Sequence, residues 1–386
     1  MMWMKVSKFG SSLVNQTVQD AKPTFIKNLN STLGNKTCII AMIDFPHQIR
    51  IKDLKMKLVI GIDVSKKKLD LSTYDGKQYK SFCIENSKKG IISFLKNYDT
   101  VKNECLFLME ATGVYHLNLV TIIYDKGFKV GVVNPLRIKR YAQMKMIRVK
   151  TDAVDAKIIA EYGFEQPVSL YNPKSKDRQK IISFLKAIEA HSKTKEIYYN
   201  RLEALTQYPA QKKIVINSFK KIIKLLEKEI KMFEQELRKL VSLHYPKEYR
   251  LLTGIDGVGF KTAVVIIGYF GKFENFENSK QVASFIGINP SPKESGSSVK
   301  GRGNISKQGN SYLRKQLFMT SLSAMQHNKT CKELYDRLKN KGKEHKVCRV
   351  AVMNKLVKQI FAIVKYDRVY DSNYCRNFLP IQHSTS

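Results

Sequence analysis

The order of apolar runs between residues 58 and 162 constrains the fold of this chain more than any other feature. Short runs typical of buried strands alternate there with stretches of helical periodicity. The strand-like runs are 58–64, 68–74, 77–84, 105–109 and 128–133, and the helical stretches are 87–97, 115–126 and 152–162. Asp75-Gly76, between two of the strand-like runs, is a strong hairpin signal. This order predicts an α/β domain.

Acidic side chains stand at the ends of two predicted strands and at the start of the last predicted helix. Asp63 and Glu110 each follow an apolar run, so each marks a place where a buried strand reaches solvent. Asp152 and Asp155 are three residues apart and share one helix face, where like charges repel unless a cation or a base lies between them. Compensation of the helix dipole would also explain this second pair.

The element order is that of an RNase H-like fold, in which catalytic carboxylates gather at the ends of central strands. Four carboxylates are a natural set for two divalent ions that bridge a scissile phosphate. The chain carries 68 Lys and Arg against 33 Asp and Glu, a net charge of +35. That excess favours a polyanionic partner, although a solvated basic surface is the plain alternative. Together these features indicate phosphodiester chemistry on nucleic acid.

Composition excludes several other classes of protein. No apolar run reaches the roughly 18 to 20 residues that span a bilayer, so we expect a cytoplasmic protein without a membrane partner. The six cysteines are scattered and form no Cys-x-x-Cys pair, so we interpret them as reduced thiols rather than zinc ligands or disulfides.

At 386 residues the chain is long enough for two or three domains. Its first segment lacks sustained periodicity and is either the product of a start codon placed too early, with Met56 as the true start, or a basic arm. The predicted segments are the leader 1–55, a catalytic domain 56–170, a helical coiled-coil region 171–245, a third domain 246–330, and a basic helical extension and tail 331–386.

Apolar residues in the helical region recur at steps of three and four over three heptads, which indicates a coiled-coil seam. The seam consists of Phe219, Ile222, Leu226, Ile230, Phe233, Leu237 and Leu240. One long helix packed on its own domain would show the same pattern. A second helical stretch at 181–205 precedes Pro209, so an antiparallel helical pair and an intersubunit coil both remain open.

The third domain opens with glycines spaced two and three apart between helical flanks, from Gly254 to Gly259. A helix-hairpin-helix turn needs such glycines because its backbone amides approach a phosphate closely. We therefore expect Gly257, Gly259, Lys261 and Thr262 to contact a nucleic-acid backbone, with a purely structural turn as the alternative.

A polar segment at 289–314 contains the candidate nucleophile. Ser295 lies next to Gly296 and is followed by the cations Lys300, Arg302, Lys307 and Arg314, which would neutralise phosphate charge. By composition alone this segment is a flexible loop that contacts nucleic acid. The chemistry also does not separate Ser295 from Ser297 or Ser298.

The motifs along residues 57–330 resemble, in order, those of the DEDD-type insertion-sequence transposases, the RNA-bridged recombinases. The segments that carry the resemblance are Gly61-Ile62-Asp63-Val64-Ser65-Lys66, Met109-Glu110-Ala111-Thr112-Gly113, Val133-Asn134-Pro135, Lys150-Thr151-Asp152-Ala153-Val154-Asp155-Ala156, the turn from Gly254 to Ala263, Gly287-Ile288-Asn289-Pro290 with Ser295-Gly296, and Ile305-Ser306-Lys307-Gln308-Gly309-Asn310 with Leu313-Arg314.

The resemblance implies a RuvC-like domain whose acids Asp63, Glu110, Asp152 and Asp155 bind Mg²⁺ or Mn²⁺. It also implies a coiled-coil insertion and a C-terminal transposase domain whose Ser295 forms a covalent phosphoserine link with DNA. The partners implied are donor and target DNA, a structured non-coding RNA from the element, and further copies of the chain in a dimer or tetramer. The leader before Met56 is not part of the family pattern.

These observations favour a site-specific DNA recombinase that moves its own insertion element. A metal-dependent, structure-specific endonuclease without a covalent step is the alternative within the enzymes. A non-catalytic architectural protein is the alternative outside them, and it would tolerate replacement of the four acids.

Overall fold

The computed structural model describes residues 48–49, 56–111, 115–149, 151–208, 213–295 and 299–373. The predicted leader therefore lies outside the described residues, except for the strand β1 (Gln48–Ile49). This strand pairs antiparallel with β7 (Val168–Ser169), so two residues of the leader segment take part in the fold. None of the described helices is long and apolar enough to cross a membrane.

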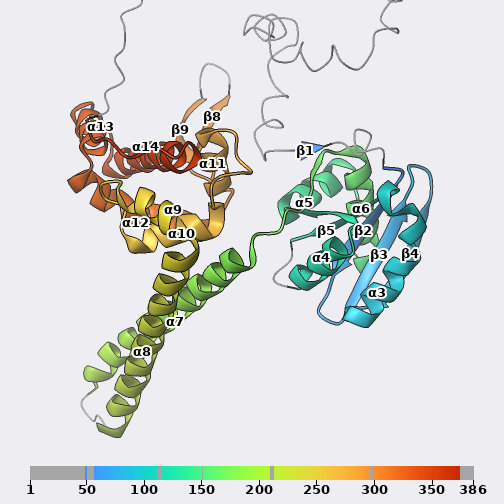
Figure 1. The fold of residues 1–386 in the computed structure, drawn as a ribbon, viewed down its shortest axis with the longest axis horizontal. Helices are drawn as coiled ribbons and strands as arrows, with labels where there is room; N and C mark the ends of the chain where they lie inside the picture. Colours follow the sequence, from blue (N-terminus) through green and yellow to red (C-terminus); the bar gives the residue numbers. More distant parts are fainter. Residues whose placement is uncertain are drawn as a thin grey trace, which may run out of the picture. The chain divides into compact units, whose positions relative to one another are not determined.

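A mixed five-stranded sheet forms the centre of the first domain (Figure 1). Its strands are β2 (Leu58–Val64), β3 (Lys68–Tyr74), β4 (Tyr79–Glu85), β5 (Cys105–Glu110) and β6 (Lys129–Val133). They lie in the order β4-β3-β2-β5-β6, with β2, β5 and β6 mutually parallel and the β2-β3-β4 meander antiparallel. The predicted α/β domain is thus confirmed.

Helices cover both faces of this sheet. Buried residues of α3 (Lys88–Lys96) and α4 (His116–Asp125) share one core with Ile60 and Ile62. Buried residues of α5 (Pro135–Met144) and α6 (Asp152–Glu165) share the other with Val59. The two cores follow from strand alternation, since successive β2 side chains point to opposite faces. A 3₁₀ segment, η2 (Asp99–Glu104), leads into β5.

Two long helices, α7 (Lys176–Thr206) and α8 (Lys213–His244), follow this domain in the chain. They pack against each other as an antiparallel pair: the Phe184 and Phe233 rings lie tilted to each other with centroids 5.7 Å apart, and Tyr198 lies near Phe219 at 5.4 Å. The coiled-coil seam of α8 therefore has a partner within the same chain, which is the antiparallel pair that the sequence left open.

The remaining elements form a mainly helical domain around one core. They are α9 (Pro246–Thr253), α10 (Phe260–Phe270), α11 (Ser279–Ile286), β8 (Pro290–Ser295), β9 (Val299–Ile305), α12 (Ser311–His327), α13 (Lys329–Asn340) and α14 (His345–Lys365). The apolar α10 is buried almost throughout. Residues from Ile181 in α7 to Val364 in α14 belong to this C-terminal core, so the extension predicted at 331–386 supplies part of it.

Arg178, near the start of α7, fixes the helical pair to this core. Its guanidinium donates to the carbonyl oxygens of Gly268 and Tyr269, at 3.3 and 2.9 Å, at the end of α10. These carbonyls lack partners within the helix, so the arginine acts as a C-cap.

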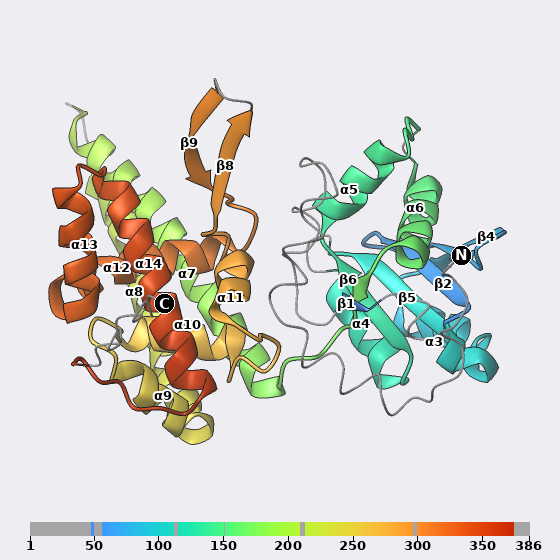
Figure 2. The same cartoon turned by 90° about the horizontal axis from the view of Figure 1, so that it is seen from above.

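The segment at 289–314 is not a flexible loop. Strands β8 and β9 form a two-stranded antiparallel hairpin with a register shift between Ser291 and Lys293 (Figure 2). Composition misled the prediction because this hairpin has no apolar alternation; it is held by main-chain pairing and by contacts at its base.

Candidate active site

A glycine sets the distance between the central strand and the helix that carries two of the predicted acids. A Cβ atom on Gly61 would overlap the carbonyl oxygen of Ala156 and the amide nitrogen of Ala160, both in α6. Only glycine leaves room for this approach, and it brings the N-terminus of α6 over the end of β2. Thr151 caps the helix by accepting a hydrogen bond from the Val154 amide at 3.3 Å.

Strand alternation places three acids on the α6 side of the sheet. Ile62 and Met109 pair in register and both point into the opposite core, so Asp63 and Glu110, each one residue on, face α6. Asp70 pairs directly with Asp63 across β2 and β3 and faces the same way. Each of the three strands thus contributes one carboxylate to this face.

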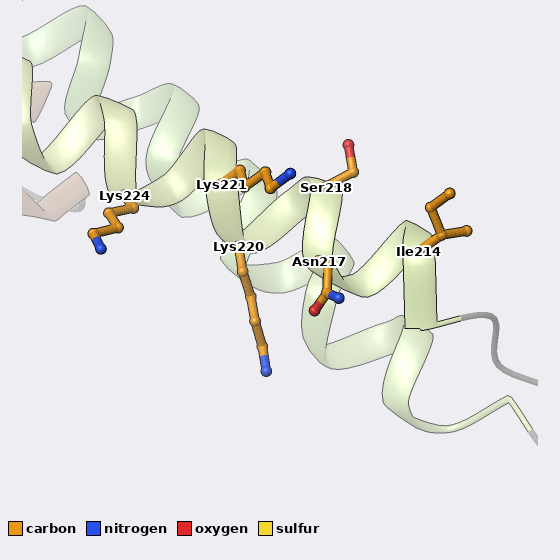
Figure 3. A pocket seen from close by; sticks show the side chains of 6 residues that line it. All are labelled: Ile214, Asn217, Ser218, Lys220, Lys221 and Lys224. Carbon is orange, nitrogen blue, oxygen red and sulfur yellow. The ribbon is translucent and has the colours of Figure 1, made fainter.

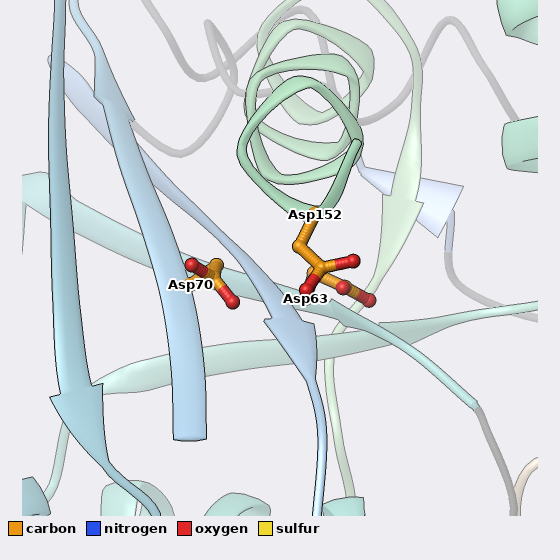
Figure 4. Close-up of side chains that lie close together, drawn as sticks. All are labelled: Asp63, Asp70 and Asp152. Carbon is orange, nitrogen blue, oxygen red and sulfur yellow. The ribbon is translucent and has the colours of Figure 1, made fainter. Parts of the chain in front are cut away.

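Asp63, Asp70 and Asp152 converge, with one carboxylate oxygen of each lying within 4.8 Å of the others (Figure 4). Asp70 is buried to 9% exposure, which is unusual for an acid without a specific role. Asp70 was not among the predicted site residues. Strand alternation alone indicates that Asp70 faces away from the core that Leu69 and Leu71 enter, but its place opposite Asp63 depends on the register between β2 and β3.

Lys68 is the cation of this acidic cluster. Its Nζ lies 2.7 Å from Asp152 Oδ2 and 3.1 Å from Asp70 Oδ2. The hydrogen bond from Lys68 holds the pKa of Asp152 below its usual range, and the same carboxylates raise the pKa of Lys68. Lys68 therefore balances part of the negative charge that Asp63, Asp70 and Asp152 bring together.

The pKa of Asp63 is shifted in the opposite direction to that of Asp152. Burial raises the pKa of its carboxyl, and the negative charges of Asp152, Asp155 and Asp70 raise it further. A nearby divalent cation would reverse this, since it favours the ionised form. Three carboxylates within reach of one another are oxygen ligands of the kind that Mg²⁺ and Mn²⁺ prefer, so the residues fit a divalent metal ion.

The other two predicted ligands flank the cluster. Glu110 ends β5, half-buried, and pairs with Val133 of β6. Asp155 lies in the first turn of α6, three residues after Asp152, and its charge raises the pKa of Asp63. The structure thus groups Asp63 and Asp152 with Asp70, and places Glu110 and Asp155 on the same side of the sheet.

In the glycine turn between α9 and α10, one glycine packs against another helix, and a second has free space around it. Gly257 has φ +88°, and a Cβ there would lie 2.6 Å from the Ala324 Cα in α12. Around Gly259 a Cβ would meet nothing within 4 Å, so the start of α10 is accessible there. Gly257 is therefore needed for packing on α12, whatever the turn binds.

The two polar residues predicted beside this turn already have protein partners. Lys261 is exposed, with its Nζ 2.9 Å from Glu234 Oε1 of α8. Thr262 is buried, and its hydroxyl lies 2.7 Å from that of Thr320. A hydroxyl inside the core does not reach a phosphate, so we leave Thr262 out of the proposed nucleic-acid interface.

Ser295 is the last residue of β8 and pairs with Val299 across the hairpin. Gly296, Ser297 and Ser298 lie outside the described residues, as do the side chains of Ser295, Lys300 and Arg302. Lys307 is exposed, with φ +54°. Arg314 instead donates from Nη1 to the carbonyl oxygen of Ile286 at 2.8 Å, so its guanidinium binds a protein group.

Near the beginning of α8 an exposed hollow carries positive charge. Figure 3 shows Lys220, Lys221 and Lys224 projecting from the helix beside Ile214, Asn217 and Ser218. Three cations within two turns of one helix make a local site of positive potential.

Two family models match the chain over the two regions just described. Residues 60–195 match a DEDD-type IS110 transposase domain, and residues 249–336 match the domain described as the transposase IS116/IS110/IS902 family. The chain belongs to the IS110 family of transposases. The first match contains the acidic cluster, and the second contains the glycine turn and the β8–β9 hairpin. As an IS110-family member the chain is a DNA transposase or recombinase.

Individual relatives agree with this assignment. The chain is 29% identical over 323 residues to the pilin gene-inverting protein of Moraxella lacunata, in an alignment that covers 82% of the chain and 98% of that protein. It is 23% identical over 354 residues to the transposase for insertion sequence element IS1111A of Coxiella burnetii, covering 83% and 92%. Similarity to these two relatives thus extends over most of both chains.

Proposed function

We propose that this transposase cuts and rejoins DNA through a covalent bond between Ser295 and a DNA phosphate, with divalent metal ions held by its carboxylates. The observation that carries the proposal is the meeting of Asp63, Asp70 and Asp152 within 4.8 Å on one side of the sheet. Carboxylates that lie this close together repel one another unless cations lie between them. The chain as a whole has a net charge of +35, which suits the polyanionic substrate of a transposase.

The sheet order supports an RNase H-like, RuvC-like identity for the first domain. Three parallel strands, with an antiparallel meander beside the first, place Asp63 and Glu110 at adjacent strand ends. Asp152 and Asp155 enter from the helix on the same side. In this proposal Asp63, Glu110, Asp152 and Asp155 hold Mg²⁺ or Mn²⁺, with Asp70 supporting them. The bound metal would stabilise negative charge on the phosphate.

The serine step conserves the energy of the phosphodiester bond. The Ser295 hydroxyl loses its proton and its oxygen bonds to phosphorus, while the bond from phosphorus to a deoxyribose oxygen breaks and that oxygen takes up a proton. Attack by a hydroxyl of another DNA strand then releases the serine and makes the new junction. Equal numbers of phosphodiester bonds break and form, so rejoining needs no external energy source.

Positive charge outside the catalytic residues supports nucleic-acid partners. Lys300, Arg302 and Lys307 lie in or beside the hairpin, and Lys220, Lys221 and Lys224 on α8 offer a further backbone contact. We propose that these surfaces hold donor and target DNA and a structured RNA of the element, with base pairing choosing the sequence. An oligomer would allow the carboxylates of one subunit to act with the serine of another.

The test is to trap a protein–DNA adduct on a recombining substrate and to map the modified residue by peptide mass. We expect the adduct on Ser295, its loss in Ser295→Ala, and its retention in Ser291→Ala, a control on the same strand. Asp63→Asn should also abolish it. Cleavage that survives Ser295→Ala but requires Asp63 would instead indicate a metal-dependent endonuclease without a covalent step. An adduct mapped to Ser297 or Ser298 would show that one of these serines, and not Ser295, is the nucleophile.

A further inference from the structure

The base of the β8–β9 hairpin is closed by main-chain hydrogen bonds to the end of α11. The Ser306 amide donates to the carbonyl oxygen of Asn289 at 2.9 Å, and the Lys307 amide to that of Gly287 at 3.1 Å. The Asn310 amide donates to the carbonyl oxygen of Phe285 at 3.3 Å. The two ends of the hairpin are thus tied to one helix terminus, and we call residues 285–290 with 305–310 the hairpin base.

Arg314 reaches this base from the first turn of α12. Its Nη1 donates to the Ile286 carbonyl oxygen at 2.8 Å, beside the point where α11 ends. Gly287 makes room for it: a Cβ there would lie 2.8 Å from that Nη1 and 2.9 Å from the Gln308 carbonyl oxygen. Gly287 also has φ +81°, a conformation that favours glycine. The guanidinium therefore occupies a space shaped for it by a missing side chain.

Gly309 closes the base from the other side. Its φ is +156°, and a Cβ atom there would overlap the Phe285 carbonyl oxygen. Asn310, which follows, caps α12 by accepting a hydrogen bond from the Leu313 amide at 3.1 Å. The direction of α12, the position of Arg314 and the end of α11 are consequently fixed by one continuous set of contacts.

A two-stranded hairpin is only marginally stable by itself in water, and this one also contains a register shift. Its direction therefore depends on its base more than on its own ladder. Ser295 lies at the far end from that base, five residues beyond Pro290. A small rotation at the base becomes a large displacement at the serine, and misplacement by about 1 Å can cost about a hundredfold in rate.

We propose that Arg314 is a positioning residue that fixes the base of the β8–β9 hairpin and so aims Ser295 at the scissile phosphate. This inference rests on the proposed function for Ser295. It gives Arg314 a role different from neutralising DNA phosphates, because its guanidinium is already bound to a carbonyl oxygen of α11. Gly287 and Gly309 serve the same geometry by leaving space at the base.

The two roles of Arg314 separate in experiments on Arg314→Ala, Arg314→Lys and the control Lys315→Ala, an exposed cation on the same helix turn. The first measurement is the single-turnover rate of adduct formation at saturating DNA. The second is the DNA concentration for half-saturation as a function of salt. The third is hydrogen exchange at the amides of Ser306, Lys307 and Asn310, with the α10 and α14 amides reporting that the core is folded.

For Arg314→Ala we expect the adduct rate to fall by roughly ten- to a hundredfold, with faster exchange at the three base amides. Half-saturation and its salt dependence should match the parent protein, and Arg314→Lys should restore part of the rate. If Arg314→Ala disrupts the core, the adduct rate, the salt dependence of binding and the exchange at the base amides are compared between Arg314→Lys and the parent protein instead.

Two results would overturn the proposal. One is a salt slope reduced by about 0.9, the value for one lost phosphate contact, with an unchanged rate at saturation. The other is unaltered exchange at the hairpin base. If Ser295→Ala still forms the adduct, the proposed nucleophile is wrong, but the exchange data still show whether Arg314 holds the base.

Discussion

The Lys68 ammonium lies 2.7 Å from a carboxylate oxygen of Asp152 and 3.1 Å from one of Asp70. A positive side chain thus sits among acids that fit a divalent metal ion. Lys68 is half-exposed, whereas Asp70 is buried in the sheet. We infer that Lys68 balances the charge of these acids when metal is absent.

Lys68→Ala should lower the melting temperature in EDTA, because three carboxylates then face one another without their cation. Without the Lys68 hydrogen bond, the pKa of Asp152 should rise toward its ordinary value. Added Mg²⁺ should raise the melting temperature by more than it does in the parent protein, since binding to the folded state stabilises it. Lys57→Ala, which breaks a surface ion pair with Glu104, is the control. An equal Mg²⁺ response in all three proteins would contradict the inferred balance.

Asp63→Asn should stabilise the metal-free protein at neutral pH. The folded-state pKa of Asp63 is raised, so ionisation disfavours folding at pH above its ordinary value of 3.8, and the penalty is complete above the raised pKa. Below pH 3.8 the carboxyl is protonated in both states and the penalty vanishes. Thermal unfolding in EDTA across this range should therefore show an advantage of Asp63→Asn that disappears as pH falls. DNA cleavage should drop by at least about a hundredfold. A variant less stable than the parent at every pH would refute the electrostatic argument.

Asp70→Asn should weaken Mg²⁺ binding although the sequence pattern did not single this residue out. Asparagine keeps the shape but removes a charge that lies within 4.8 Å of Asp63 and Asp152. We expect the Mg²⁺ concentration for half-maximal cleavage to rise by roughly 10- to 100-fold, as for groups that support metal ligands. Asp75→Asn, in the exposed β3–β4 turn, should leave it unchanged. An unchanged Mg²⁺ requirement in Asp70→Asn would remove Asp70 from the site.

Gly61→Ala should destabilise the first domain and separate its acids. The new methyl group would overlap main-chain atoms of Ala156 and Ala160, which cannot rotate away, so α6 must shift. Overpacking of this kind costs about 1–3 kcal/mol, and the shift moves Asp152 from Asp63. Gly259→Ala is the matched control, since its Cβ would meet nothing within 4 Å. Denaturant unfolding and Mg²⁺ titration should change for Gly61→Ala alone; equal behaviour of the two variants would show that the contact is unimportant.

Thr262→Val should lower stability without changing how the protein binds DNA. Thr320 donates to the Gln316 carbonyl oxygen at 2.8 Å, so Thr262 donates to Thr320. Losing this bond should cost about 0.5–1.5 kcal/mol, measured by denaturant unfolding, and Thr320→Val should add little in the double variant. The salt dependence of DNA binding should stay the same. A reduced salt slope in Thr262→Val would indicate that Thr262 contacts DNA despite the burial of its side chain.

The sequence predicted the first domain well because its elements carry local signals. Thr151 caps α6, and the Asp75-Gly76 turn joins β3 to β4 as predicted. The helix α5 was missed although Asn134 and Pro135 are ordinary start signals, because its short polar sequence hides the apolar side formed by Ile138 and Tyr141.

Features that depend on distant parts of the chain were harder to predict. Asp70 joins the cluster only because β3 pairs with β2 in one register, which no local pattern specifies. Arg314 was predicted to bind phosphate from its charge, whereas its carbonyl partner in α11 lies 28 residues away in the sequence. Thr262 was predicted to contact a nucleic-acid backbone because it follows a glycine turn, but the helix periodicity of α10 directs its side chain toward α12.

The absent side chain of Gly61 has an evolutionary consequence. Strand β2 and helix α6 touch there through main-chain atoms, and these atoms are the same whichever residues surround them. The separation between Asp63 and Asp152 therefore depends at this point on main-chain contact rather than on the packing of particular side chains, provided that the glycine stays. In a lineage in which most residues have been replaced, Asp63 and Asp152 can stay in place as long as residue 61 remains glycine.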